Sequence, residues 1–391
     1  MSTKNERIFQ TIGYFAGYVA ISICRAIMGP SLPYLANHTH AQLNQISFVF
    51  VAINLGNMIG NWQGGKLFDR IPGHALMMAA LIIIGITLAL IPTAPYLWLL
   101  AAIIMLLGIA VGLLEIGVNT LLIWVHQHRV GPFMIGLYLF GGIGAILSPL
   151  AVGRSVLLHG DIQWGYWLMA LLVVPMILWL VRLPSPAAHS VSLDDPAAKS
   201  DPLLALSISI LYFLYVGSFS STSGWLFSYV IAMNLAGELT AAYLNSAFWL
   251  ALTAGRLAMI PLINRFNPRW VLAGNLLGGL LGMGIILLWP GSLAAVWVGT
   301  LVFAFLMASF MPTGMVLAQR TMTVSGQVTS WFMLSGSLGA ILMPWLSGQL
   351  FTHIGPRAVM FVSATALIAG LLVLVGYRAL IRARLRNVKT T

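Results

Sequence analysis

Two charged residues stand inside long apolar segments of the chain, where a charge is costly and usually has a function. Glu115 is the only acid within such a segment, and Arg25 lies in the middle of the first one, residues 8–35. If the two side chains face each other, they partly offset their desolvation, whereas an isolated Glu115 would tend to take a proton. The pair therefore predicts reversible proton binding, and we name both residues as candidates for proton coupling.

The same pair allows two other roles. A permanent salt bridge could simply hold the first and fourth apolar segments together. Alternatively, Arg25 could bind a carboxylate or phosphate of a substrate, so both Arg25 and Glu115 also belong to the candidate substrate site. All three roles require contact. Along their helices the two positions differ in depth by about 8 Å, most of which an arginine side chain can bridge.

Hydrogen-bonding side chains extend this candidate site. Asn54, Asn57 and Asn61 share one helical stripe, and Asn119 lies one turn after Glu115. Interhelical hydrogen bonds explain the stripe as well as substrate contact does. In the second half of the chain, hydroxyl, amide and indole groups recur at helical spacing and suit an uncharged polyhydroxylated ligand, although helix packing is the alternative for each: Tyr215, Ser218, Thr222, Trp225, Asn245, Trp249, Trp331 and Ser335.

The elements that must position these residues are membrane-spanning helices. Hydrophobic residues make up 60% of the chain and charged residues 7%, which a soluble surface cannot accommodate. Alternating ten-residue strands of a barrel are absent. We predict an all-α membrane protein with twelve transmembrane helices, each of about 20 residues or more: 8–35, 43–65, 75–93, 96–125, 131–156, 163–182, 203–233, 240–263, 270–289, 293–318, 326–352 and 357–380.

The basic residues predict the orientation, because Lys and Arg accumulate in cytoplasmic loops. With both termini in the cytoplasm, only Arg25, Arg154 and Arg357 of the 19 basic residues lie away from the cytoplasmic side. This bias explains the net charge of +11 without a nucleic-acid partner. The basic stretch 378–389 is interpreted as a topological anchor beside anionic lipid headgroups, with a specific lipid site as the alternative.

Several kinds of chemistry lack the residues they need. Cys24 is the only cysteine, which excludes an internal disulfide and a cysteine-cluster metal site. The chain has neither an HExxH motif nor a GxxxxGK[ST] loop, so we expect no metal, no cofactor and no ATP hydrolysis, and we do not expect an enzyme. The first helix has no cleavage site and is predicted to be retained. Short loops and termini favour a monomer in a bacterial inner membrane.

The sequence repeats itself at an offset of 195 residues. Residues 144–149, GAILSP, recur as GAILMP at 339–344, and Gly60 and Arg70 fall on Gly255 and Arg265. Such a repeat is typical of a duplicated helical bundle. We predict two six-helix bundles, residues 1–182 and 203–391, joined by a cytoplasmic linker at 183–202.

Residues 65–74, GKLFDRIPGH, resemble the signature loop of the major facilitator superfamily of secondary transporters. His74 stands where that loop usually has an arginine or lysine. The resemblance implies two pseudo-symmetric bundles that alternate access to a central site. Charged hydrogen bonds among Asp69, Arg70, Arg265 and Arg269 predict a gate at the cytoplasmic face, with a plain topology signal as the alternative.

Within that superfamily, residues 114–119, LEIGVN, are similar to the helix 4 acid motif of fucose permeases. Residues 215–217, 224–225 and 243–249 resemble sodium-dependent glucose transporter-like proteins. Both groups carry a further acid, at the positions of Gly29 and Phe219, that this chain lacks. Neither sugar specificity nor sodium coupling therefore carries over directly from these groups.

Together these observations predict a symporter for a small, sugar-like polar solute, coupled to protons rather than sodium. Because of Arg25 and the two missing acids, the alternative is a transporter of an organic anion, a siderophore or a drug. A third possibility is a membrane sensor without transport activity.

Overall fold

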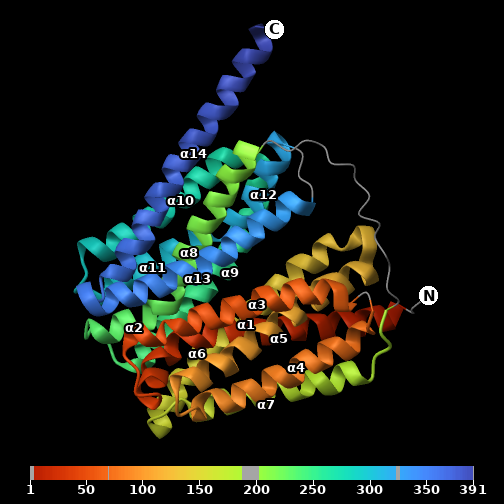
Figure 1. Cartoon of the computed structure of the whole chain (residues 1–391), viewed down its shortest axis with the longest axis vertical. Coiled ribbons are helices and arrows are strands. Elements are labelled where there is room, and N and C mark those ends of the chain that lie inside the picture. The colour runs from red at the N-terminus through yellow and green to blue at the C-terminus, as the bar shows by residue number, and fades with distance from the viewer. Residues whose placement is uncertain (1–3, 69, 187–201, 323–325, 391) are drawn as a thin grey trace. The chain divides into compact units, whose positions relative to one another are not determined.

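The computed structural model describes residues 4–68, 70–186, 202–322 and 326–390, and these form long helices without strands (Figure 1). The first six predicted spans correspond to α1 (Lys4–His38), α2 (Leu43–Ile46) with α3 (Phe48–Phe68), α4 (Gly73–Leu90), α5 (Leu97–His126), α6 (Gly131–His159) and α7 (Gln163–Val181). The other six correspond to α8 (Pro202–Ala232), α9 (Glu238–Arg265), α10 (Pro268–Leu288), α11 (Leu293–Met307) with α12 (Phe310–Thr321), α13 (Gly326–Ile354) and α14 (Ala358–Thr390). Short 3-10 turns, η1 (Ile91–Thr93) and η2 (Gln127–Arg129), follow α4 and α5.

The predicted all-α membrane fold is confirmed. Within the described residues, ten candidate membrane spans are long and apolar enough to cross a bilayer. The long helices α9, of 28 residues, and α13, of 29 residues, occupy the ranges of the remaining two predicted spans. The structure also differs from the prediction in detail, because α14 continues as a helix to Thr390, well past the predicted end at residue 380.

The tenth predicted span is broken at Ala308 and Ser309, between α11 and α12. A break in a helix leaves backbone donors without their usual acceptors. The buried side chain of Asn275, on α10, lies against this break. With its amide oxygen turned toward the break, it accepts from Ser309 Oγ at 2.9 Å and from the Phe310 N–H at 3.0 Å. One amide thus replaces the missing intrahelical bond.

The internal repeat is visible in where the helices begin. Helices α4 and α10 start at Gly73 and Pro268, and α7 and α14 start at Gln163 and Ala358, each pair 195 residues apart. The turns before α7 and α14 also match. Gly160 and Gly355 have φ values of 72° and 107°, a left-handed conformation that favours glycine. The sequence offset therefore relates equivalent positions in the structure.

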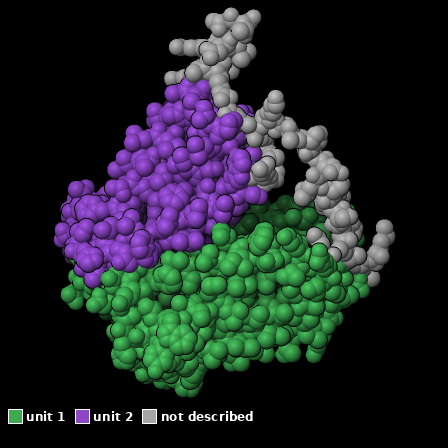
Figure 2. All heavy atoms as spheres, viewed as in Figure 1, with its two compact units in different colours: residues 1–192, 224–250 green, residues 193–223, 251–391 purple. Residues whose placement is uncertain are grey.

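The chain forms two compact units (Figure 2). The first unit comprises residues 1–192 and 224–250, and the second comprises 193–223 and 251–391. Segment 224–250 groups with the first unit through contacts such as the hydrogen bond from Ser246 Oγ to the Ile146 carbonyl, at 2.9 Å. Most of the predicted linker, residues 187–201, lies outside the described residues, so the boundaries of the two predicted bundles stay a prediction.

In the first unit, glycines bring α3 and α5 into backbone contact. A Cβ atom at Gly60 would overlap the Ile109 carbonyl, and one at Gly112 would overlap the Asn57 carbonyl. Small residues spaced four apart permit such close crossings of membrane helices. The crossing lies directly before Glu115 on α5 and at Asn57 on α3, and so it fixes the distance between these two side chains.

Candidate functional site

Arg25 and Glu115 form an ion pair within the first unit. Arg25 Nη2, from the middle of α1, lies 2.6 Å from Glu115 Oε2, on α5. The side chains are 40% and 22% exposed, respectively, so protein atoms do not seal the pair on all sides. This open side is what a proton or a substrate requires for access, whereas a purely structural clamp would need none.

Asn57 and Asn61, both on α3, extend the pair into a chain of hydrogen bonds. Asn57 Nδ2 donates to Glu115 Oε2 at 3.4 Å, and Asn61 Nδ2 donates to Asn57 Oδ1 at 3.0 Å. One carboxylate oxygen therefore accepts from two different helices. Asn61, named above only as a member of the asparagine stripe, thus reaches the ion pair through Asn57, four residues before it on α3.

The other two asparagines of the first half turn back onto their own helices. Asn54 Nδ2 donates to the Phe50 carbonyl at 2.9 Å, and Asn119 Nδ2 donates to the Glu115 carbonyl at 2.7 Å. Asn119 thus contacts the backbone of Glu115 and not its carboxylate. The predicted roles of Asn54 and Asn119 in substrate binding stay predictions.

In the second unit, hydroxyls of α8 bond to α14. Thr222 Oγ1 and Ser363 Oγ are 2.9 Å apart, and Ser218 Oγ donates to the Ser363 carbonyl at 3.4 Å. Both α8 residues are completely buried. These hydroxyls therefore serve the contact between two helices, the packing role that the sequence left open. Their predicted role in binding a substrate stays untested.

Tyr215 occupies a different environment on α8. Its ring stacks on Phe310 with centroids 4.4 Å apart and an interplanar angle of 6°. Phe310 is the position 195 residues after Glu115, and Ser220 is the position equivalent to Arg25. An aromatic stack on Phe310 thus replaces the carboxylate of the first half, and the ion pair has no equivalent in the second.

The remaining predicted substrate residues are divided between the units. Trp225, Asn245 and Trp249 belong to the first unit, where Trp225 is fully buried with its ring 6.1 Å from that of Phe50. Trp331 and Ser335, on α13, belong to the second unit with Tyr215, Ser218 and Thr222. Within one unit, the structure brings together Arg25, Asn57 and Glu115.

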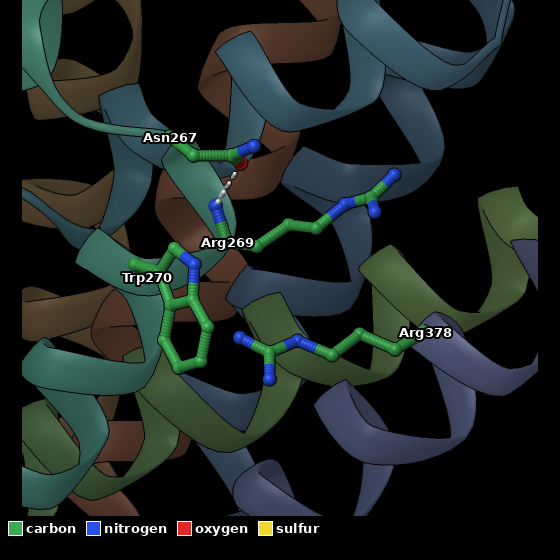
Figure 3. A pocket seen from close by; sticks show the side chains of 4 residues that line it. All are labelled: Asn267, Arg269, Trp270 and Arg378. Atoms are coloured by element: carbon green, nitrogen blue, oxygen red, sulfur yellow. Dashed lines mark hydrogen bonds between the residues drawn. The ribbon is translucent and has the colours of Figure 1, made fainter.

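The predicted cytoplasmic gate is only partly described. Asp69 lies outside the described residues, while Arg70 is exposed in the turn after α3 and Arg265 lies at the end of α9. Arg269 lines a pocket at the start of α10 together with Asn267, Trp270 and Arg378 (Figure 3). The gate therefore stays a prediction.

His74, in the signature loop, is a buried hydrogen-bonding residue at the start of α4. Its Nδ1 lies 3.0 Å from the Leu183 carbonyl, and its Nε2 lies 3.0 Å from Tyr14 Oη. Because a carbonyl only accepts, Nδ1 carries a proton, and Nε2 can then accept from the tyrosine hydroxyl in the neutral ring. Through these two bonds His74 connects α4 to α1 and to the residues that follow α7. The role of this side chain is therefore structural and not that of a charged residue on the surface.

The comparisons with known proteins identify relatives over most of the chain. A family model, the Major Facilitator Superfamily, matches residues 14–342 and 237–390. The sodium-dependent glucose transporter 1 of Xenopus laevis is 25% identical over 357 residues, which cover 83% of this chain and 72% of that protein. The major facilitator superfamily domain-containing protein 4A of Mus musculus is 23% identical over 441 residues, covering 87% and 86%.

Solved structures share the fold. The crystal structure of the nucleoside transporter NupG superposes with a TM-score of 0.74 at 14% identity, covering 96% of this chain and 98% of that one. A bacterial homologue of the human lysosomal transporter Spinster has a TM-score of 0.71 at 14% identity, with 97% of each chain covered.

Proposed function

The chain belongs to the Major Facilitator Superfamily, and on this basis we propose that it moves a small, sugar-like solute across the membrane in symport with protons. Its relatives in the family are multi-pass membrane transporters and not enzymes, and this chain is a transporter of that kind.

The ion pair of Arg25 and Glu115 carries the proposal of proton coupling. Arg25 Nη2 lies 2.6 Å from Glu115 Oε2, and a proton on Glu115 would remove the negative charge that holds Arg25. Arg25 and Asn57 would then be released from the carboxylate together, because both donate to Glu115 Oε2. A proton thus has a local structural consequence on three helices, as a coupling site requires.

A sugar-like solute fits the amide groups beside this pair. The Asn57 and Asn61 side chains offer both donors and acceptors, which suit hydroxyl groups of a substrate. Relatives whose names refer to glucose, and a structural neighbour whose name refers to nucleosides, support a solute that contains a sugar ring. The word sodium in the name of the first of these makes Na⁺ the competing coupling ion.

The proposed arrangement is the one that a duplicated bundle supports. Residues 1–182 and 203–391 form two six-helix halves that move as bodies around the solute, with 183–202 as the cytoplasmic linker. We propose a monomer in the inner membrane with both termini in the cytoplasm, since that orientation places the clustered basic residues inside.

Transport of an organic anion is the second candidate function. The observation that favours it is the exposure of Arg25, whose side chain is 40% exposed and so remains accessible beside Glu115. A guanidinium with a free edge binds carboxylates and phosphates well. Competition of a labelled hexose, a labelled nucleoside and a labelled organic anion against unlabelled members of each class separates the candidates.

The test of the coupling proposal is Glu115→Gln in proteoliposomes. With an inwardly directed proton gradient, the wild type should accumulate solute, and the variant should lose accumulation while it retains solute exchange at equal concentrations. Glu238→Gln, the same chemical change at an exposed position at the start of α9, is the matched control and should accumulate normally.

Three other outcomes would contradict the proposal. Uphill uptake by Glu115→Gln would remove this residue from the coupling step. Accumulation driven by a sodium gradient without a proton gradient would establish the other ion. If the wild type neither accumulates nor exchanges any of the three solute classes, the chain would be a sensor and not a transporter.

A further inference from the structure

A basic pocket lies where the beginning of α10 meets α14, in the second unit (Figure 3). Its lining consists of Asn267, Arg269, Trp270 and Arg378, and its volume is about 140 Å³. The candidate membrane spans of these two helices are residues 268–288 and 358–381. The pocket lies at the ends of both spans and therefore near the level of the membrane surface.

Arg378 has a hydrogen-bonding capacity that the protein leaves unused. Its guanidinium carbon lies 4.3 Å from the centroid of the Trp270 ring, so one face of the group is engaged in a cation–π contact. Its Nη2 is buried and has no hydrogen-bond partner within the part of the chain that the structure describes. Stacking does not satisfy an N–H, and a buried charged donor without an acceptor is unfavourable.

The surroundings of Arg378 add positive charge. Arg269, the second residue of α10, also lines the pocket (Figure 3). The start of α10, where Asn267 Oδ1 accepts from the Arg269 N–H at 3.1 Å, contributes the partial positive charge of a helix N-terminus. None of the four lining residues is acidic. The charge of this lining therefore suits an anion.

The internal repeat shows that the fold does not demand such a pocket. The positions 195 residues before Arg269 and Arg378 are His74 and Leu183. There, His74 Nδ1 bonds to the Leu183 carbonyl at 3.0 Å, and the buried ring also meets Tyr14. At these equivalent positions the first half has an internal, neutral hydrogen bond. The second half has a pocket lined by two arginines instead.

We propose that the pocket binds a phosphate group. A planar guanidinium held against an aromatic ring presents its N–H edge to phosphate oxygens, and a second arginine and the helix start complete the site. The phosphate has two possible sources: the headgroup of an anionic phospholipid, or a soluble phosphate. Trp270, which is 67% exposed, suits the first source because tryptophan concentrates at the membrane interface.

The experiment uses the full-length protein purified in a neutral detergent. Thermal stability is measured while phosphatidylglycerol, phosphatidylcholine or inorganic phosphate is added separately, and bound lipid is counted by native mass spectrometry. We expect saturable stabilisation and one retained phosphatidylglycerol, with no equivalent effect of phosphatidylcholine. Stabilisation by inorganic phosphate alone would assign the pocket to a soluble phosphate instead.

Variants locate the binding. Arg378→Gln and Arg269→Gln should each weaken apparent affinity for the effective ligand about tenfold, because each removes a charge-assisted contact. Arg320→Gln, an equal charge change at an exposed position on α12, is the matched control and should leave affinity unchanged. Arg378→Lys keeps the positive charge but not the two parallel N–H donors of the guanidinium. Its apparent affinity should lie between those of Arg378→Gln and the wild type.

Three results would overturn the proposal. The first is the absence of any stabilisation by either phosphate source. The second is an equal loss of affinity in Arg320→Gln and Arg378→Gln, which would indicate general attraction to the basic surface. The third is retention of phosphatidylglycerol by a folded Arg269→Gln, Arg378→Gln double variant with the affinity of the wild type.

Discussion

Arg25 and Glu115 meet at 2.6 Å although 90 residues separate them in the chain. The contact joins α1 to α5, and it is reinforced by Asn57, on α3. Because the two charged side chains satisfy each other between membrane helices, each should depend on the other for stability.

A double-mutant cycle tests this dependence. Arg25→Met should lower the free energy of unfolding by roughly 1–3 kcal/mol, less than for a fully buried pair because the side chains remain partly exposed. Adding Glu115→Gln should restore part of the loss, because no unpaired charge then remains. Thermal unfolding of the four purified proteins measures the coupling. Additive effects of the two substitutions would show that the pair contributes nothing jointly.

Asn57 and Asn119 provide a comparison of two amides near the same carboxylate. Asn57→Ala removes a donor to Glu115 Oε2, whereas Asn119→Ala removes a bond to the Glu115 backbone. We expect Asn57→Ala to slow proton-driven uptake about tenfold, the effect of losing one hydrogen bond to a charged group. Asn119→Ala should retain uptake near that of the wild type. Initial rates of uptake in proteoliposomes measure both effects. A slower uptake by Asn119→Ala than by Asn57→Ala would contradict the role of Asn57 beside the carboxylate.

The glycine crossing of α3 and α5 predicts an unusual sensitivity to a single methyl group. Gly112→Ala would push a Cβ atom into the Asn57 carbonyl, so we expect a loss of about 1–3 kcal/mol in stability together with impaired uptake. Gly65→Ala is the control, since nothing lies within 4 Å of a Cβ at that helical position. It should be neutral or slightly stabilising, because alanine favours helices. Equal melting temperatures for the two variants would argue against a close backbone contact between α3 and α5 at Gly112.

The hydrogen bond between Tyr14 and His74 predicts a structural role for the histidine. Tyr14→Phe should cost about 1 kcal/mol, and His74→Phe should cost more because it also leaves the Leu183 carbonyl without its donor. His74→Arg introduces the arginine that is usual at this position of the signature loop. It also buries a charge, so it should lower the stability of the protein further. Denaturation in detergent measures all three. A stable His74→Arg with normal uptake would indicate that the loop accommodates a surface charge.

Part of the candidate site was predictable from residue type alone. Glu115 and Arg25 stand out because a charge in an apolar segment needs a partner, and here each had one obvious choice. The partners of Asn57 and Asn61 were not predictable, because an asparagine stripe fits several neighbours equally well. For the hydroxyls of Ser218 and Thr222 the sequence allows either substrate contact or helix packing, and in the structure they bond to Ser363 on α14. Nothing in the spacing along α8 identifies that distant partner.

What the sequence by itself determined is the set of helices, their approximate ends and the repeat. Crossing a bilayer depends on the composition of about 20 consecutive residues, which is a local property. The tertiary structure alone decided which side chains meet. Whether Asn57 reaches Glu115, and whether position 269 faces an internal acceptor or a basic pocket, depends on how the helices rotate and how closely they cross. Packed glycines and neighbouring helices far away in the chain set those distances, and no local pattern carries that information.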